Sequence, residues 1–584
     1  MTESSTIDYG IDFKWQTYPP TRPELDPDGY DTWAPDVVVV GAGPVGLTIA
    51  AGLTRLGVRT LVLESDNAVC RSSRASGISQ HTFEVINRVA PGAGDKLASQ
   101  GIPTLGSETY FGHRLVLRQE SAPIGETQGK YPPNTYLSQW NIEQALVDVL
   151  ADRRDVAEIR WQARVTHLEH GPDGAEVTVV SPDGSSYRIR APWIVATDGS
   201  RSIVRNELGL RMTGQAYEVF FVVVDAQVAG TPPPPIRRVW FDPNYLPGGL
   251  LLRHMSPDGI WRLDFQLPIG ADVDAALRPE RVEQLIRDHL ADIGFETDLV
   301  RPIWISAYTA RALSLDNYRH GRVLFAGDAA HLVPIFGGFG LNSGIDDADN
   351  LQWKLALVVR GGAEDALLDS YDTERAAAVH SSLTFVTRAA EFMTPTSVES
   401  ERLREAALSL AAQGNQLTAD LSRHRPFHPV PYPESSRCLP DADEFDSGPG
   451  PGEQSARGWV EDDTGQSHYL LDLLGAPLTA LVLMPDITAA GDLAAALRAA
   501  LALHGENVSV VSVTAGPSKG YVYSGSPQLF ARFGAPHGAV YLLRADTVVA
   551  ARWSRPAVTD VARAVATVLG VHASMPGLLG EAAR

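Results

Sequence analysis

The chain has 584 residues, enough for about two to four domains with a large buried core, and its 44% hydrophobic and 20% charged residues are typical of soluble globular proteins. Its formal net charge of −21 argues against nucleic acid or an anionic membrane surface as a partner. The only cysteines, Cys70 and Cys438, exclude a disulfide framework and a cysteine metal cluster, so we predict no metal site and a reducing, cytoplasmic location.

The N-terminal residues 1–34 are polar, acidic and rich in proline, and they lack the apolar core of a signal peptide. We therefore expect an N-terminal arm. No run in the chain approaches the ~18 apolar residues of a membrane span, so no membrane segment is predicted.

A nucleotide-binding unit is predicted directly after this arm. Four consecutive valines at 37–40 indicate a buried parallel strand, because such a strand is covered on both faces. Gly41, Gly43 and Gly46 follow with G-x-G-x-x-G spacing. The first glycine permits a tight turn, the second lets the backbone approach a pyrophosphate, and the third lets the helix pack on the strand.

The rest of this unit also has the expected order. A helix is predicted over about 44–56 and a second strand over 58–63, and Glu64 stands at the end of that strand. A carboxylate at this place accepts hydrogen bonds from the hydroxyls of an adenosine ribose. A structural glycine turn is the alternative, but it explains neither the second strand nor the acid.

Residues 65–205 contain three further candidates. Arg74 taken alone is an ordinary surface charge, and Gln139 precedes a predicted helix, where a polar cap is the simpler interpretation. After two strands joined by a Pro-Asp-Gly turn, an apolar strand runs into Asp198-Gly199. An aspartate at a strand end is usually a turn residue, so a functional role needs a second anchor.

Between residues 206 and 310, strand-like runs separated by Pro, Gly and Asp predict an inserted, mainly antiparallel sheet. Its aromatic and polar residues are candidates for lining a pocket, although each one alone is more often a core or surface residue. These residues are Tyr217, Trp240, Tyr245, Arg253, His254 and Gln266.

A glycine-rich segment follows this sheet. A strand over 323–326 ends in Gly327-Asp328, and glycines at 337, 338, 340 and 344 precede or open a helix that starts near Leu341-Asn342. Backbone N–H groups at such a helix entry can hold an anion or a flavin carbonyl. Further helices occupy about 363–422, a proline-rich linker spans 424–457, and 458–584 alternates strands and helices as a small α/β domain.

Three segments together carry a family resemblance: GAGPVG with Glu64, ATDG at 196–199, and AGDAAH at 326–331 followed by GFGLNSG and DADNLQWKL. They resemble the single-component (class A) FAD-dependent aromatic hydroxylases, and the resemblance covers about 36–390. The C-terminal part is similar to the thioredoxin-like domain of the larger members, namely phenol, 3-(3-hydroxyphenyl)propionate and polyketide hydroxylases.

The resemblance implies an α/β fold in which a Rossmann-like FAD-binding domain carries an inserted, mainly antiparallel β-sheet substrate domain and a C-terminal thioredoxin-like α/β domain. The predicted parts are an arm (1–34), the FAD-binding domain (35–205 and 311–423), the substrate domain (206–310), a linker (424–457) and the thioredoxin-like domain (458–584).

Residue by residue, the resemblance implies that Gly41, Gly43 and Gly46 hold the FAD pyrophosphate, Glu64 the ribose and Asp328 the ribityl chain. Asp198 is implied for both FAD and NAD(P)H. The full set expected to contact the cofactor is Gly41, Gly43, Pro44, Val45, Gly46, Glu64, Ser65, Arg74, Gln139, Val165, Asp198, Gly199, Asp328, Pro334, Gly340, Leu341 and Asn342.

Three departures from the family pattern are visible. Pro334-Ile335 stands where many members have two prolines, and His81 stands where an arginine is common. Residues 458–584 contain no cysteine, which excludes disulfide redox chemistry in that domain. The first two departures leave FAD binding intact but leave the substrate and the rate open.

The implied activity is an FAD-dependent monooxygenase that uses NAD(P)H and O₂ to hydroxylate a small phenolic or other electron-rich aromatic substrate through a flavin C4a-hydroperoxide. Tyr217, Tyr245 and His254 are the candidates for deprotonating the phenol, and a homodimer is expected. The alternatives are Baeyer–Villiger or epoxidation chemistry on an aromatic polyketide, an NAD-dependent dehydrogenase, and a flavin-binding module with a decayed active site.

Overall fold

The computed structural model describes the whole chain except residues 1–5, 8–12, 72–74, 124–128, 258, 268–269, 337, 396, 424–426 and 572–584. Two compact units are distinguished. Unit 1 comprises Met1–Ala348 and Val379–Pro429, and unit 2 comprises Asp349–Ala378 and Val430–Arg584.

The first sheet of unit 1 is the nucleotide-binding sheet. Its strand order is β10-β4-β3-β14-β21-β20, in which the first five strands are parallel and β20 is antiparallel. The strands are β10 (Ala157–Arg160), β4 (Thr60–Leu63), β3 (Val37–Val40), β14 (Trp193–Ala196), β21 (Val323–Phe325) and β20 (Arg319–His320). Helix α1 (Pro44–Arg55) follows β3 and packs against α5 (Gln139–Ala151). The predicted strand–helix–strand unit is therefore present.

A second sheet of eight strands follows the order β22-β19-β15-β18-β17-β16-β7-β8, and all neighbours are antiparallel except β16 and β7. The strands are β22 (His331–Leu332), β19 (Val300–Ser314), β15 (Thr213–Val228), β18 (Ile260–Gln266), β17 (Leu250–Ser256), β16 (Ile236–Phe241), β7 (Gly106–Phe111) and β8 (Arg114–Glu120). The sheet is mainly antiparallel, as expected, but it also includes β7 and β8, which lie outside the predicted 206–310 insertion.

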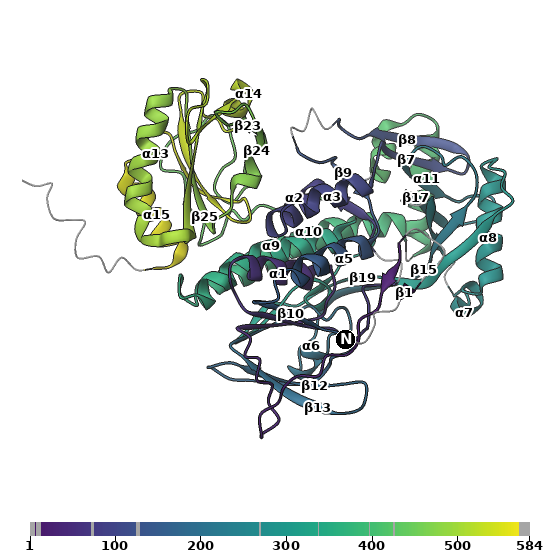
Figure 1. Cartoon of the computed structure of the whole chain (residues 1–584). Helices are drawn as coiled ribbons and strands as arrows, with labels where there is room; N and C mark the ends of the chain where they lie inside the picture. Colours follow the sequence, from purple (N-terminus) through teal and green to yellow (C-terminus); the bar gives the residue numbers. More distant parts are fainter. Residues whose placement is uncertain are drawn as a thin grey trace, which may run out of the picture. The chain divides into compact units, whose positions relative to one another are not determined.

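Each face of the eight-stranded sheet has its own apolar cluster, because side chains alternate along a strand. One face carries Val222, Val224 and Leu251 and packs against α8 (Pro279–Asp292), which Figure 1 shows beside the sheet. The opposite face carries Phe221, Val223 and Leu252, together with Ala390 of α10 (Leu367–Met393) and Leu408 of α11 (Val398–Ala412). Here it is called the inner face.

Smaller elements complete unit 1. Strands β11 (Arg164–His170), β12 (Ala175–Val180) and β13 (Ser186–Ala191) form an antiparallel three-stranded sheet. Strands β5 (Gly77–Ser79) and β9 (Asn134–Tyr136) pair beside helix α2 (Gln80–Val89).

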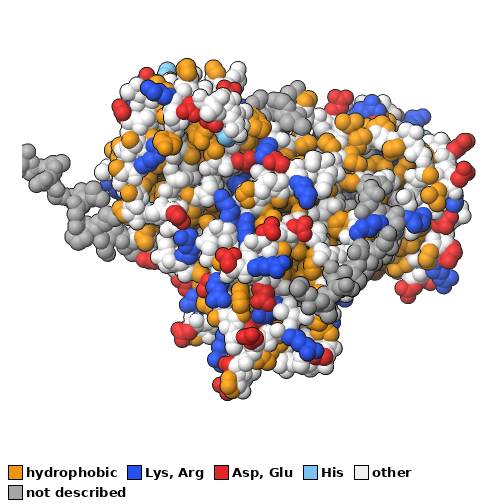
Figure 2. Space-filling model, viewed as in Figure 1, with side chains coloured by type: hydrophobic (Ala, Val, Ile, Leu, Met, Phe, Trp, Pro, Cys, Tyr) orange, Lys and Arg blue, Asp and Glu red, His pale blue; other side chains and the backbone are white. Residues whose placement is uncertain are grey.

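On the side of the molecule drawn in Figure 2, acidic and basic side chains are interspersed.

Unit 2 is built on a seven-stranded mixed sheet. Its order is β24-β23-β27-β26-β25-β28-β29, with central β25 parallel to β26 and antiparallel to β28. The strands are β23 (Trp459–Glu461), β24 (Ser467–Tyr469), β25 (Leu478–Met484), β26 (Val508–Thr514), β27 (Val522–Gly525), β28 (Ala539–Arg544) and β29 (Val549–Trp553). Helices α13 (Ile487–Leu501) and α15 (Val558–Leu569) lie side by side on this sheet (Figure 1).

Helix α13 and the turn after it, Ile487–Asn507, are long and apolar enough to cross a membrane by length and composition alone. In unit 2, however, its Ala490, Ala494 and Leu497 are fully buried, and the helix packs on β25 and β26. Packing on the sheet therefore accounts for part of the apolar composition of this helix.

The proline-rich segment predicted as a linker is attached to unit 2 along much of its length. Leu439 N–H donates to the carbonyl of Ala550 at 2.7 Å, and Asp441 pairs with Arg552 at 2.7 Å. Asp443 accepts hydrogen bonds from the N–H and hydroxyl of Ser554. These contacts hold the segment along β29.

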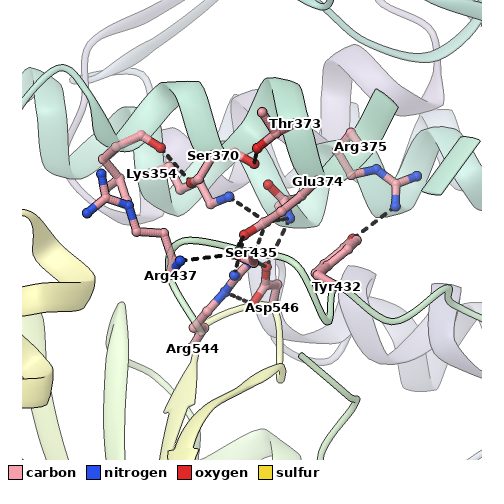
Figure 3. A network of polar contacts seen from close by, with 12 residues as sticks. Lys354, Ser370, Thr373, Glu374, Arg375, Tyr432, Ser435, Arg437, Arg544 and Asp546 are labelled. Carbon is pink, nitrogen blue, oxygen red and sulfur yellow. Dashed lines mark hydrogen bonds and ion pairs between the residues drawn. The ribbon is translucent and has the colours of Figure 1, made fainter. Parts of the chain in front are cut away.

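A buried ionic network joins four parts of unit 2 (Figure 3). The carboxylate of Glu374 in α10 accepts two hydrogen bonds of 2.7 Å from Arg544 at the end of β28. The ammonium group of Lys354, in α9 (Phe339–Val359), lies 2.7 Å from the same carboxylate, and Asp546 pairs with Arg544. These side chains are almost completely buried, two cations face two anions, and burial lowers the pKa of Lys354 to about 8.

The Glu374→Gln substitution should destabilise unit 2 strongly, because it leaves Lys354 and Arg544 buried with one carboxylate fewer. Removing one partner of a buried pair typically costs about 3–5 kcal/mol of the free energy of unfolding. Calorimetry should show the transition of unit 2 at a lower temperature, whereas Glu391→Gln, at an exposed position of the same helix, should leave it unchanged. Equal melting temperatures for both variants would show that the network adds no stability.

Candidate flavin and substrate site

The predicted cofactor motifs all lie at one edge of the nucleotide-binding sheet. In the register of the sheet, Val40 pairs with both Leu63 and Ala196, and Ala196 pairs with Phe325. The segments that follow these four residues begin with Gly41, Glu64, Thr197-Asp198 and Ala326 before Asp328. The carboxyl ends of parallel strands are where nucleotides bind in such folds. The sheet therefore brings together motifs that are up to 290 residues apart in sequence.

The three glycines of the first turn serve different purposes. A Cβ atom on Gly41, whose φ is +106°, would lie 2.5 Å from the carbonyl oxygen of Thr197, and one on Gly46 would lie 2.2 Å from the carbonyl oxygen of Gly41. Gly43 has an ordinary backbone conformation (φ −73°, ψ 176°), and a Cβ there would meet nothing within 4 Å. The fold therefore requires Gly41 and Gly46, whereas Gly43 leaves open space at the N-terminus of α1, where a pyrophosphate fits.

Glu64 is held by the turn that it faces. One carboxylate oxygen accepts from the N–H of Ala42 at 2.8 Å, and the other accepts from the hydroxyl of Ser65 and the N–H of Asp66. The side chain is half-buried, and a carboxylate offers about four acceptor sites. Three are used within the protein, so the oxygen that faces Ala42 has capacity for a ribose hydroxyl.

The two residues after Gly43 shape the entry of α1. Pro44 occupies the first turn of the helix, a position that suits its fixed φ. Val45 packs where Gly327 and Gly344 leave room, since a Cβ on those residues would approach its Cγ2 atom to 3.0 and 2.7 Å. Val45 thus joins the first turn to the third motif.

The two carboxylate oxygens of Asp198 differ in their hydrogen bonds. Oδ2 accepts from the N–H of Val204 in the short helix α6 (Ile203–Glu207). Oδ1 is buried and accepts no hydrogen bond from the part of the chain that the structure describes, and burial raises the pKa of Asp198. Such an oxygen suits a ligand donor. Gly199, with φ +79°, makes the turn that follows.

Arg205 ties the second motif to the third. Its guanidinium donates to the carbonyl of Ser200 at 2.7 Å and to the carbonyl of Ala329 at 3.1 Å. The role of Arg205 was not predicted from the sequence, although it lies seven residues after Asp198.

A buried pair, His331 and Asp347, holds the turn at Gly327-Asp328 in place. This pair was not predicted from the sequence. One oxygen of Asp347 accepts from the N–H of Gly327 at 2.9 Å and lies 2.8 Å from Nε2 of His331. His331 and Asp347 are completely buried, whereas Asp328 is exposed between buried neighbours. The pair thus holds the turn in which Asp328 can reach a ligand.

The side chain of Asn342 is fully engaged within the protein. Its oxygen accepts from the Ser79 N–H and the Thr82 hydroxyl, and its nitrogen donates to the carbonyls of Gly77 and Gly338. The backbone N–H groups of Gly340 and Leu341 belong to the first turn of α9, where N–H groups have no acceptor within the helix. These backbone groups, rather than the amide side chain, can hold a flavin carbonyl.

The remaining predicted cofactor residues have mixed positions. Gln139 donates to Glu143, whose other oxygen accepts from the N–H of Cys70. Val165 is buried in β11, two residues after Ala163, whose N–H donates to the backbone carbonyl of Glu64. Pro334 is buried. Arg74 and the glycine at 337 lie outside the described residues.

The inner face of the eight-stranded sheet meets the loop that contains Pro334. Ile335 and Phe336 pack in its apolar cluster with Tyr217, Phe221 and Leu250, and Tyr308 donates to the carbonyl of Val333 at 3.3 Å. Tyr308 was not predicted as a site residue. An apolar surface next to a cofactor edge suits a planar aromatic substrate.

His254 also points to the inner side, because it alternates with Leu251 and Met255 of the opposite face along β17. Its Nε2 atom lies 2.7 Å from the hydroxyl of Ser76, and its ring stacks on Tyr136 at 4.4 Å. Burial, reinforced by Arg262 and Arg237, lowers the pKa of His254 well below its usual value. The imidazole is therefore neutral at pH 7.

The three predicted catalytic candidates do not share one place. Tyr217 and His254 lie on the inner side of the sheet. Tyr245 packs at the opposite cluster under α8, where its hydroxyl is 3.0 Å from Nδ1 of His289 and burial raises the pKa of Tyr245. The geometry therefore brings two of the three candidates to the flavin-side elements.

The described residues fit the FAD nucleotide. They combine an open glycine turn at a helix start, an acid at the end of the second strand and an unpartnered aspartate oxygen. Comparison with known proteins agrees. The family described as FAD binding domain matches residues 34–386. The chain belongs to that family.

Two relatives in this family are hydroxylating enzymes. The 3-(3-hydroxy-phenyl)propionate/3-hydroxycinnamic acid hydroxylase of Mycolicibacterium smegmatis is 33% identical over 402 residues, which cover 68% of each chain. The 6-methylpretetramide 4-monooxygenase of Streptomyces rimosus is 34% identical over 350 residues, covering 58% of this chain and 59% of the relative. The predicted resemblance is thereby confirmed, and the protein is an FAD-dependent monooxygenase of the aromatic-hydroxylase class.

Solved structures support the same fold. The flavin-dependent monooxygenase PieE in complex with FAD and substrate superposes with a TM-score of 0.76 at 23% identity, and aklavinone-11 hydroxylase with FAD and aklavinone superposes with 0.71 at 24%. Each match covers 92% of this chain and 99% of the other. At this identity the likeness concerns the fold alone.

Substituting Gly43 and Gly46 should separate cofactor binding from folding. Gly43→Ala should fold normally, because its Cβ meets no protein atom, but should weaken FAD binding where the backbone must approach the pyrophosphate. Gly46→Ala should lose stability as apoprotein, because its Cβ clashes with backbone that cannot move. Thermal melting of the apoproteins and flavin titration measure the two effects. Normal FAD affinity in Gly43→Ala would contradict the cradle at this turn.

Proposed function

We propose that the protein hydroxylates a phenolic ring of a small aromatic acid or an aromatic polyketide, using NAD(P)H and O₂. The observation that supports this most is the meeting of the apolar inner face with the loop at Ile335-Phe336, beside the edge where the cofactor motifs gather. The names of the two relatives above give 3-(3-hydroxyphenyl)propionate, 3-hydroxycinnamic acid and 6-methylpretetramide as model substrates.

In this proposal the chain binds FAD with the residues predicted for it, and bound FAD supplies the redox chemistry with O₂. The Gly43 turn receives the pyrophosphate, Glu64 the ribose and Asp328 the ribityl chain. Arg74, Gln139 and Val165 remain proposed contacts. The unpartnered Oδ1 of Asp198 is proposed to accept a hydrogen bond from FAD or from NAD(P)H.

His254 is proposed as the group that accepts the proton of the substrate phenol. A neutral imidazole can take a proton, and its hydrogen bond to Ser76 orients the ring. Tyr217 is a weaker candidate, because burial raises the pKa of its phenol and makes it a poor base at neutral pH. Tyr245 lies at the other face of the sheet and is the weakest.

Unit 2 is proposed to contain a thioredoxin-like domain that has lost redox chemistry, since residues 458–584 contain no cysteine. Its role would then be structural, either within one chain or in a homodimer. A cytoplasmic location is proposed on the basis of cysteine usage and composition.

The proposal is tested by the FAD-loaded enzyme and a panel of phenols that includes 3-(3-hydroxyphenyl)propionate and polycyclic phenols. At least one compound should stimulate NAD(P)H oxidation and yield a product that has gained one oxygen atom with its rings intact. A product with an inserted ring oxygen would favour Baeyer–Villiger chemistry. Consumption of NAD(P)H that no compound stimulates would contradict the proposed function.

The role of His254 predicts a particular pH dependence. Its folded-state pKa is lowered, so it stays neutral down to pH values well below 6.5, and kcat/KM for hydroxylation should show no loss between pH 8 and 6.5 from its protonation. His254→Gln should retain FAD but slow hydroxylation by roughly 10²–10⁴-fold, whereas His170→Gln, at an exposed position, should not. An acid limb centred at pH 6.5 or above, or full activity in His254→Gln, would contradict this role.

A further inference from the structure

The inner face of the eight-stranded sheet carries a polar row next to its apolar rows. His254 of β17 pairs with Arg262 of β18, and Arg262 pairs with Asp225 of β15. On the other side of β17, Arg253 pairs with Arg238, so the next step of that register places Arg237 opposite His254. Arg237 lies two and four residues before Val239 and Phe241 of the inner cluster and therefore shares their face.

Other arginines of this sheet have partners. Arg238 and Arg118 both pair with Glu108, at 2.7 and 2.6 Å. Arg262 lies 2.5 Å from Asp264 and 3.7 Å from Asp225, so it forms ion pairs with both carboxylates of the polar row. Arg253 lies over the rings of Trp240 and Trp261.

Arg237 differs from its neighbours. Among the described residues, none accepts a hydrogen bond from its guanidinium or forms an ion pair with it, although it is half-buried. The groups whose charge acts on Arg237 are Asp264 and Tyr136. Asp264 already accepts a hydrogen bond from Arg262, and the ring of Tyr136 stacks on His254. Burial lowers the pKa of Arg237, as expected for a cation without a close anion. Five N–H donors are thus available beside His254.

A second observation on the same face points to a ligand. Gln266, two residues after Asp264 in β18, is 7% exposed, and its Oε1 atom has no hydrogen-bond partner among the described residues. Buried polar atoms in native proteins rarely lack a partner. Gln266 is level with Leu250 and Phe241, four residues along the strands from the level of His254 and Arg237, so a ligand that reaches both groups must extend along the strands.

We propose that Arg237 is a specificity-determining residue that binds an anionic oxygen of the substrate, a carboxylate or an ionised phenol or enol, beside His254. The inference rests on the proposed function and narrows its substrate class to acidic aromatic compounds. A guanidinium binds a carboxylate through two parallel hydrogen bonds, and this fixes the orientation of the ring relative to His254.

Matched pairs of aromatic ligands test this proposal on the FAD-loaded enzyme. Each pair consists of an acid and its neutral amide, for example 3-(3-hydroxyphenyl)propionate and its amide, together with a polycyclic phenol carboxylate and its amide. Flavin absorbance measures the dissociation constants. The wild type should bind the acid more tightly than the amide. In Arg237→Met the ratio of the two dissociation constants should fall by roughly 10- to 150-fold, as expected for the loss of one charge-assisted contact. Arg237→Lys should retain part of the preference.

Arg311→Met, at an exposed position on β19, is the control and should keep the preference. A polycyclic phenol that binds with the same Arg237 dependence in its amide form would identify the phenolate or enolate, rather than the carboxylate, as the anion. Equal binding of acids and amides by the wild type with no dependence on Arg237, or an unchanged preference in Arg237→Met, would overturn the proposal.

Melting temperatures of the ligand-free variants test independently whether Arg237 is unpaired. If Arg237 is unpaired, Arg237→Met should raise the melting temperature of the ligand-free protein by about 1–3 °C, whereas Arg238→Met should lower it by breaking the pair with Glu108. A lower melting temperature for Arg237→Met would show a structural partner and overturn the proposal. If no member of any pair binds, the proposed function fails, and the melting comparison still decides whether Arg237 is unpaired.

Discussion

The shared register of β4, β3, β14 and β21 is the constraint on which the cofactor site depends. Because Val40 is paired with Leu63 and Ala196, and Ala196 with Phe325, four strands end at the same level. A shift of one residue in any strand would turn its side chains to the other face and move its loop away from the edge. The contacts of Glu64 with Ala42, of Thr197 with the Gly41 carbonyl, and of Arg205 with Ala329 then connect neighbouring loops. The site is thus a consequence of strand alignment, and the side-chain contacts preserve it.

Parts of the structure that depend on local patterns could be predicted from the sequence. The valine run at 37–40 and the G-x-G-x-x-G spacing predict a strand and a turn by themselves, and Asp198 and Asp328 each follow an apolar strand. The membership of β7 and β8 in the eight-stranded sheet could not be recognised, because β7 pairs in parallel with β16, 130 residues away. The His331–Asp347 pair was missed because either residue alone is unremarkable in sequence.

Arg237 and Arg238 illustrate a limit of sequence reasoning in physical terms. They are adjacent and chemically identical, yet Glu108 meets only Arg238, because alternate side chains of β16 point to opposite faces. Which of the two is paired depends on the register between β16 and β7, and no local pattern records that register. The same applies to the prolines at 429–451, whose composition indicates a linker although hydrogen bonds to β29 hold much of this segment in place.

The two units use buried polar groups in opposite ways. In unit 2, Glu374, Lys354, Arg544 and Asp546 satisfy one another, so the network contributes to stability and specifies one arrangement of the chain. On the inner side and at the cofactor edge of unit 1, Asp198 Oδ1, Gln266 Oε1 and the guanidinium of Arg237 have no protein partner among the described residues. Unsatisfied groups of this kind cost stability in the free protein, and a fold tolerates them where a ligand supplies the missing partner. The position of Asp198 Oδ1 at the edge where glycine leaves open space at position 43, and of Arg237 beside His254, is therefore consistent with a site that binds both a dinucleotide and a polar aromatic molecule.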